Sequence, residues 1–290
     1  EAVSIMVDKA NIAADTIKNN YDCCVAYYDE HLLEISIEQR RLLGEFEPAL
    51  QNDEFVMYLQ PQVKRDGAAK GAEALVRWVH PSRGILTPYA FIDILENAGL
   101  IYKLDLYIWE KAAQKLAEWK EKGYGSYHIS VNISTKDFYI IDIYETFTGL
   151  INKYGIAASN LHLEITETTL MTDFEKNMNI IHKLQGVGFR VEIDDFGSGY
   201  SSLNMLKDIS ADVLKIDMGF LRKSENEVKG QDILESIITL AGKIGMDVIT
   251  EGVETKKQLD MLTMMGCHEF QGYYFSKPIP VSEFEEKYLV

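Results

Sequence analysis

Short apolar runs alternate with amphipathic segments along the chain from Glu54 onward. Eight runs have the length and apolar content of strands, at 55–60, 71–78, 128–133, 160–166, 189–194, 212–217, 246–250 and 268–271. Most gaps between them carry apolar residues at helical spacing, as in Leu106–Lys120, Phe174–Gln185 and Ile233–Lys243. Eight strands alternating with helices over about 235 residues predict an α/β fold of the (β/α) barrel type.

Residues 1–30 follow a different pattern. Apolar residues at helical spacing come first, and Cys23–Tyr28 then predicts a single strand. One helix and one strand cannot bury a core by themselves. These residues are therefore interpreted as the end of another domain. The absence of an initiator Met indicates that the chain is a piece of a longer protein.

Residues 31–53 predict a helix that links this segment to the barrel at 54–290. Ser36 and Gln39 have the spacing of a capping box, which places the start of the helix near Ser36. Pro48 is expected to kink or restart the helix, because proline lacks the backbone N–H that an interior turn requires.

Polar side chains gather at the carboxyl ends of the predicted strands. Period-2 alternation puts Ser130 with Asn132 on one strand face, and Lys215 with Asp217 on another. The polar residues at or near strand ends are Glu73, Arg77, Asn132, Glu164, Asp194, Asp195, Lys215, Glu251 and Gln271. Each acid alone would more often be an exposed loop residue or a helix cap. The repetition at successive strand ends favours one shared site at the mouth of the barrel.

Carboxylates that converge on one mouth cannot all stay ionised without compensation. Hard divalent cations such as Mg²⁺ and Mn²⁺ prefer oxygen ligands, and two of them about 3.5–4 Å apart form a phosphoryl-transfer site. The pattern therefore predicts two divalent ions per site.

Composition narrows the choice of partners. Among the 290 residues, 29 Lys and Arg stand against 45 Asp and Glu, a net charge of −16. So acidic a protein repels nucleic-acid backbones, which excludes DNA or RNA as an expected partner. The three cysteines, Cys23, Cys24 and Cys267, have no zinc-type spacing and indicate a reducing, cytoplasmic setting. The apolar stretch Ile233–Ile249 is interrupted by charges and cannot span a bilayer, so any membrane anchor would lie elsewhere in the full-length protein.

The chain resembles the EAL domain family of bacterial cyclic di-GMP phosphodiesterases over about residues 40–290. The blocks that carry the resemblance are Gln60-Pro61, Gly71–Trp78 with its E-A-L signature, His80-Pro81, Val131–Ser134, Leu163–Glu167, Asp194–Leu203, Leu214–Asp217, Glu251–Thr255 and Gln271–Tyr273. The resemblance implies a modified (β/α)8 barrel whose first strand is antiparallel to the others. Residues 1–30 are similar to the last helix and strand of a GGDEF-like domain.

The resemblance also implies a role for each matching residue. Glu73, Asn132, Glu164 and Asp194 would hold one metal ion, and Asp194, Asp195 and Glu251 the second. Lys215 would hold or help deprotonate the attacking water, while Glu251 is open between ligand and general base. The remaining roles fall to Gln60 and Arg77 as substrate contacts, Gln271 as a positioning residue and Glu167 as the anchor of the loop Asp195–Ser202.

The implied reaction is attack of a metal-activated water on one phosphorus of cyclic di-GMP, with linear pGpG as product. The family resemblance adds a homodimer and upstream regulatory domains as expected partners. The main alternative is a receptor that binds cyclic di-GMP without cleaving it, although receptors of this kind usually lack one of the metal-binding acids.

The sequence lacks the motifs that a kinase or a serine hydrolase would need. Asp195-Phe196-Gly197 reads D-F-G, but the kinase glycine-rich loop and H-R-D segment are missing. No G-x-S-x-G motif supports a serine hydrolase. The six histidines show no H-x-x-x-H spacing, and His162 is interpreted as a core or rim residue.

Overall fold

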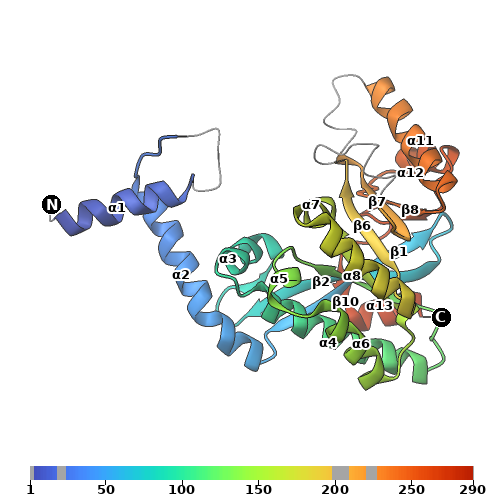
Figure 1. The fold of residues 1–290 in the computed structure, drawn as a ribbon, viewed down its shortest axis with the longest axis horizontal. Coiled ribbons are helices and arrows are strands. Elements are labelled where there is room, and N and C mark those ends of the chain that lie inside the picture. Colours follow the sequence, from blue (N-terminus) through green and yellow to red (C-terminus); the bar gives the residue numbers. More distant parts are fainter. Residues whose placement is uncertain (1–2, 18–23, 198–208, 220–226, 290) are drawn as a thin grey trace.

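A computed structural model describes residues 3–17, 24–197, 209–219 and 227–289. Figure 1 shows a barrel with helices around it and an N-terminal arm made by α1 (Val3–Asp15) and α2 (Glu30–Gln51). The last turns of α2 pack on the barrel, because Phe46 and Ala49 are buried in the common core. No helix in the described ranges is long and apolar enough to cross a membrane.

The barrel is a closed mixed sheet of eight strands, as the alternating pattern predicts. Its strands are β1 (Phe55–Lys64), β2 (Ala69–His80), β4 (His128–Ile133), β5 (Leu161–Thr166), β6 (Val191–Phe196), β7 (Val213–Asp217), β8 (Asp247–Glu251) and β9 (Glu269–Phe270). β1 pairs antiparallel with β2 and β9, whereas the ladders from β2 through β9 are parallel. The antiparallel first strand that the family resemblance implies is thus confirmed.

Two short strands were not predicted. β3 (Gly84–Leu86) continues β2 as a hairpin, and β10 (Ile279–Pro280) adds to β1. β1 and β2 also extend beyond their predicted ends, because their long antiparallel ladder runs from Phe55 to Val63. These additions leave the eight predicted strands in place, and the extension of β1 supplies the residues that pair with β9.

Helices cover the outside of the barrel. They are α3 (Ile92–Asn97), α4 (Ile101–Glu121), α5 (Asp137–Ile140), α6 (Ile143–Tyr154), α7 (Glu167–Thr172), α8 (Phe174–Val187), α11 (Glu227–Lys243), α12 (Lys256–Met264) and α13 (Val281–Tyr288), with 3-10 turns at Pro88–Ala90 and Ala158–Asn160. The three helices predicted between strands are confirmed as α4, α8 and α11. Trp109 and Trp119 of α4 are fully buried and fasten that helix to the barrel.

The structure of the N-terminal arm differs from three predictions. α2 begins at Glu30, because the Asp29 carboxylate accepts from the Leu32 N–H at 2.9 Å, so the capping box proposed at Ser36 and Gln39 is wrong. Pro48 lies in the last turns of an uninterrupted α2 and does not restart it. The strand predicted at Cys23–Tyr28 is absent from its described part, residues 24–28, which has no regular secondary structure.

Candidate active site

The buried ammonium of Lys215 lies at the centre of the predicted carboxylate cluster. Lys215 is fully buried on β7. Its Nζ is 2.6 Å from Glu164 Oε2 and 2.7 Å from Glu251 Oε1. Asp194 Oδ1 and Glu73 Oε2 follow at 3.3 and 3.5 Å. Four strands, β2, β5, β6 and β8, therefore each deliver one acid to the same lysine, as the strand-end pattern predicts.

Three amides join this cluster. The Asn132 side chain donates to Glu73 Oε1 at 3.1 Å, and the Gln271 amide donates to Glu73 Oε2. Gln271 also contacts Gln60 Oε1 at 3.4 Å, and the Gln60 amide donates to the Ser276 carbonyl at 3.3 Å. The antiparallel register of β1 against β2 places Gln60 directly opposite Glu73. The hydrogen bonds hold Glu73 in a fixed orientation toward the mouth.

The remaining predicted residues lie around the rim. Arg77 is on β2, where its guanidinium lies 5.5 Å from the Tyr58 ring centre, and burial lowers its pKa. Asp195 lies near the end of β6 and has a left-handed backbone, φ 56°, a conformation that non-glycine residues adopt rarely and often at functional sites. Glu167 begins α7. The loop that Glu167 is expected to anchor lies outside the described residues from 198 onward.

Burial and mutual repulsion set the protonation of the cluster. Burial, together with the neighbouring Asp194 and Glu73 carboxylates, raises the pKa of Glu251 to about 8. Burial and Glu73 raise the pKa of Glu164 well above its usual range, and burial with Asp194 raises that of Asp195. Burial lowers the pKa of Lys215, but the surrounding acids outweigh burial and raise it well above its usual value. Lys215 is therefore an ammonium at neutral pH.

The donor set fits divalent cations. Glu164 Oε1 is buried and has no hydrogen-bond partner among the described residues, whereas the buried Asp194 Oδ1 and Glu251 Oε1 share the ammonium of Lys215 with two further acids. Buried carboxylate oxygens without a hydrogen bond carry a desolvation penalty that a bound cation removes. Oxygen ligands from several strands are the coordination that Mg²⁺ and Mn²⁺ prefer.

We expect the melting temperature of the metal-free chain to fall by at least about 3 °C between pH 5.5 and 8, equivalent to roughly 1 kcal/mol. The folded chain keeps a proton on Glu251 up to a pKa of about 8, whereas the unfolded chain releases it near 4.5. Because the folded state binds more protons in this window, raising the pH favours unfolding. Thermal melts in EDTA check the slope. Millimolar Mg²⁺ and the variant Glu251→Gln should each flatten it, and a melting temperature that rises with pH in EDTA would contradict the cluster.

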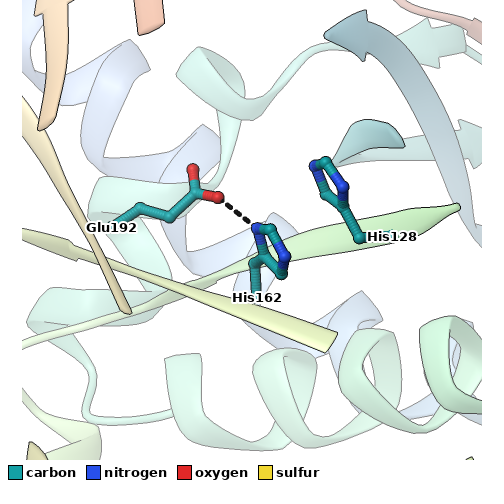
Figure 2. A group of neighbouring side chains, drawn as sticks. All are labelled: His128, His162 and Glu192. Atoms are coloured by element: carbon teal, nitrogen blue, oxygen red, sulfur yellow. Dashed lines mark hydrogen bonds and ion pairs between the residues drawn. The ribbon is translucent and has the colours of Figure 1, made fainter. Parts of the chain in front are cut away.

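A second group of interior polar residues was missed. His128, His162 and Glu192 lie at the amino ends of β4, β5 and β6, away from the mouth, and the His162 ring meets the Glu192 carboxylate (Figure 2). The prediction that His162 is a core or rim residue is correct as to burial. The alternation of side chains along a strand could have indicated this group, since each of the three residues stands two or four positions before a predicted site residue on the same strand face.

The fold and this site define an α/β-barrel protein with an acidic, cation-binding mouth at the carboxyl ends of its strands. The chain belongs to the EAL domain family, whose domain matches residues 44–278. Phosphodiesterases of this family depend on divalent metal ions.

Relatives of known name agree with this assignment. The chain is 32% identical over 93% of its length to the bifunctional diguanylate cyclase/cyclic di-GMP phosphodiesterase MucR of Pseudomonas aeruginosa. It is 33% identical over 83% of its length to the cyclic di-GMP phosphodiesterase PdeR of Escherichia coli. The chain spans only 39% and 36% of these two proteins. The structure of the MucR phosphodiesterase in complex with c-di-GMP superimposes with a TM-score of 0.79, at 33% identity, and covers 84% of this chain and 99% of that one.

Proposed function

We propose that this chain hydrolyses cyclic di-GMP to linear pGpG. The observation that carries the proposal is the complete set of acids that share the single ammonium of Lys215, with the buried Glu164 Oε1 left without a hydrogen-bond partner among the described residues. The similarity to named cyclic di-GMP phosphodiesterases supports the choice of substrate. A receptor that had lost catalysis would be expected to lack one of these acids.

The side chains divide into those that hold ions and those that handle the substrate. Glu73, Asn132, Glu164 and Asp194 would hold one divalent ion, and Asp194, Asp195 and Glu251 a second. When bound, such ions supply positive charge that acidifies water and neutralises phosphoryl oxygens.

The chain's own residues position the substrate and the attacking water, and they hold or accept protons. Arg77 reaches the rim from β2, and its forked donors suit a substrate phosphate. Gln60 orients the substrate, and Gln271 keeps Glu73 in place. Lys215, held as an ammonium, donates to the attacking water or to a phosphoryl oxygen. Glu251 serves as a metal ligand or as the general base, and its pKa of about 8 suits proton acceptance near neutral pH.

The bond changes balance without a further reactant. A water oxygen forms a bond to one phosphorus as the bond from that phosphorus to the ribose 3′ oxygen breaks. One proton of the water passes to the site and from there to the 3′ oxygen, which leaves as a hydroxyl. Cleavage of one of the two phosphodiesters opens the ring and gives pGpG.

The proposal extends to the rest of the protein. Residues 1–30 would belong to a GGDEF-like domain, 31–53 would link it to the barrel, and the barrel at 54–290 would act as a homodimer under the control of upstream domains. A cytoplasmic location suits a substrate that is an intracellular messenger.

Chromatography of the reaction mixture tests the activity directly. We expect the purified chain to convert cyclic di-GMP to pGpG with Mg²⁺ or Mn²⁺ and to form no product in EDTA. Binding of cyclic di-GMP without any product would favour the receptor, and a chain that neither binds nor cleaves would contradict the proposed substrate.

A further inference from the structure

The interior group at the amino end of the barrel has the donors of a transition-metal site. His128, His162 and Glu192 come from three neighbouring strands and are buried, with relative exposures of 9%, 4% and 0%. One ring nitrogen of each histidine and one oxygen of the glutamate all lie within 4.8 Å of one another. Figure 2 shows the three side chains gathered together.

The hydrogen bonds of His162 leave a place for a cation. Its Nε2 is 3.2 Å from the Ser159 carbonyl, which can only accept, so Nε2 carries a hydrogen. Its Nδ1 is 2.5 Å from Glu192 Oε1. A neutral imidazole has a single N–H, so Nδ1 and the carboxylate would face each other as two acceptors. Either a proton or a metal ion must neutralise this pair.

The hydrogen bonds of His128 also leave one ring nitrogen with a lone pair. Its Nε2 is 2.7 Å from Gln62 Oε1, while the Gln62 amide nitrogen donates to Ser130 at 3.3 Å. This orientation of the amide makes His128 Nε2 the donor and leaves Nδ1 as a lone pair. Burial lowers the pKa of His128 well below its usual range, so the ring is neutral, as a ligand must be. Gly71 leaves room for the ring, because a Cβ there would lie 2.4 Å from it.

The buried carboxylate of Glu192 needs a positive charge, and a cavity beside it gives a cation room to enter. Glu192 Oε2 is buried and has no hydrogen-bond partner among the described residues. A cavity of about 500 Å³ is lined by all three side chains and also by Lys70 and Arg190. These two cations are paired, with Glu269 and Asp247, so they do not neutralise Glu192 by direct contact.

We propose that His128, His162 and Glu192 bind one zinc ion, which ties β4, β5 and β6 together at the amino end of the barrel. Two imidazoles and one carboxylate are a common zinc donor set, and the cavity leaves the fourth position for water. The contacts of the two Nε2 atoms with Gln62 and Ser159 are the outer hydrogen bonds that metal-bound histidines make. Imidazoles favour zinc, whereas the oxygen ligands at the mouth favour magnesium, so the two ends of the barrel select different ions.

Coordination requires the two imidazole rings to turn. They are stacked, with centroids 3.8 Å apart and planes 3° apart, so their in-plane lone pairs lie in parallel planes. They must turn until the two Nδ1 lone pairs converge. Ligand atoms about 2.0 Å from a tetrahedral zinc ion are about 3.3 Å apart, so Nδ1 of His162 and Oε1 of Glu192 separate by less than about 1 Å.

The test counts zinc in the presence of magnesium. The purified chain is stripped with EDTA, loaded with zinc in millimolar Mg²⁺, passed through a desalting column and analysed for metal by mass spectrometry. We expect one zinc per chain, two imidazole ligands in the zinc X-ray absorption spectrum and a zinc-dependent rise in melting temperature. Glu192→Gln and His162→Gln should weaken zinc binding by more than about 100-fold, beyond the loss expected from an outer-shell change.

Two controls isolate this site from others. His182→Gln, which changes an exposed histidine on α8, should keep the zinc, and so should Asp194→Asn at the mouth. If the ligand variants fail to fold, Gln62→Ala removes the outer hydrogen bond to His128, along with the one to Ser130, keeps all three proposed ligands and should weaken zinc binding about 10–100-fold.

Three results would overturn the proposal. A wild-type chain that retains no zinc would mean that a proton neutralises His162 and Glu192. Full retention by Glu192→Gln, or a zinc spectrum with oxygen ligands alone, would place the ion elsewhere.

Discussion

Asp194→Asn is expected to lower the rate of cyclic di-GMP hydrolysis by at least about 10³-fold, which corresponds to about 4 kcal/mol in the activation free energy. Asp194 Oδ1 is buried and lies 3.3 Å from Lys215 Nζ, among the acids proposed to hold both ions. The amide keeps the shape of the side chain but removes its charge and one acceptor oxygen. Glu73→Ala should have an effect of similar size, because Glu73 is the acid that Asn132 and Gln271 orient.

The fold of these variants should be intact. Replacing one of several buried like charges relieves repulsion, so the metal-free melting temperature of Asp194→Asn should equal or exceed that of the wild type. Asp232→Asn, at an exposed position on α11, serves as the matched control and should keep full activity. Turnover by Asp194→Asn within about tenfold of wild type, measured as pGpG formed at saturating Mg²⁺, is incompatible with the proposed ligand set.

Lys215→Met is expected to cost about 3–5 kcal/mol in the free energy of unfolding of the metal-free chain. The fully buried ammonium is the charge that faces Glu73, Glu164, Asp194 and Glu251. Methionine fills the volume but leaves these acids uncompensated in a site of low polarity. Hydrolysis should also be lost, because the proposed donor to the water or phosphoryl oxygen is gone.

Chemical denaturation in EDTA and in Mg²⁺ measures this loss. Magnesium should restore part of the stability, since bound cations neutralise the same acids. Lys257→Met, at an exposed lysine of α12, should change stability by less than about 0.5 kcal/mol. A second test combines Lys215→Met with Glu164→Gln, which should destabilise less than the two single changes added together. Additive effects would show that the lysine and the acid do not interact.

The sequence predicts the barrel and its mouth because both depend on local alternation. Each β4–β8 strand is a short apolar run, and the polar residue that ends it faces the same edge of a parallel sheet. Hydrophobic period alone carries no strand direction, so the antiparallel β1 came from the family resemblance. The short β10 depends on pairing with the distant β1, which a local pattern does not record, and the three-residue β3 is too short to show a period.

Two errors have simple physical causes. The start of α2 was placed at Ser36 because a capping-box pattern occurs there, but the carboxylate of Asp29 caps the helix earlier and Ser36 becomes an interior residue. His128, His162 and Glu192 were not brought together, because two histidines and a glutamate on three different strands have no fixed sequence spacing. Only the register of β4, β5 and β6 makes them neighbours.

The antiparallel β1 has a consequence for how the chain reaches its fold. Val63 pairs with Phe270, and Tyr58 with Pro280, so the seam that closes the barrel joins segments about 200 residues apart. Closing a flexible loop of that length costs about 3 kcal/mol more than closing a ten-residue hairpin. The β1–β2 ladder can form as soon as its residues are synthesised, whereas the other edge of β1 must wait for residues 269–280. Until then that edge is an open template for strands of other molecules, and the pairing of these residues ends the exposure.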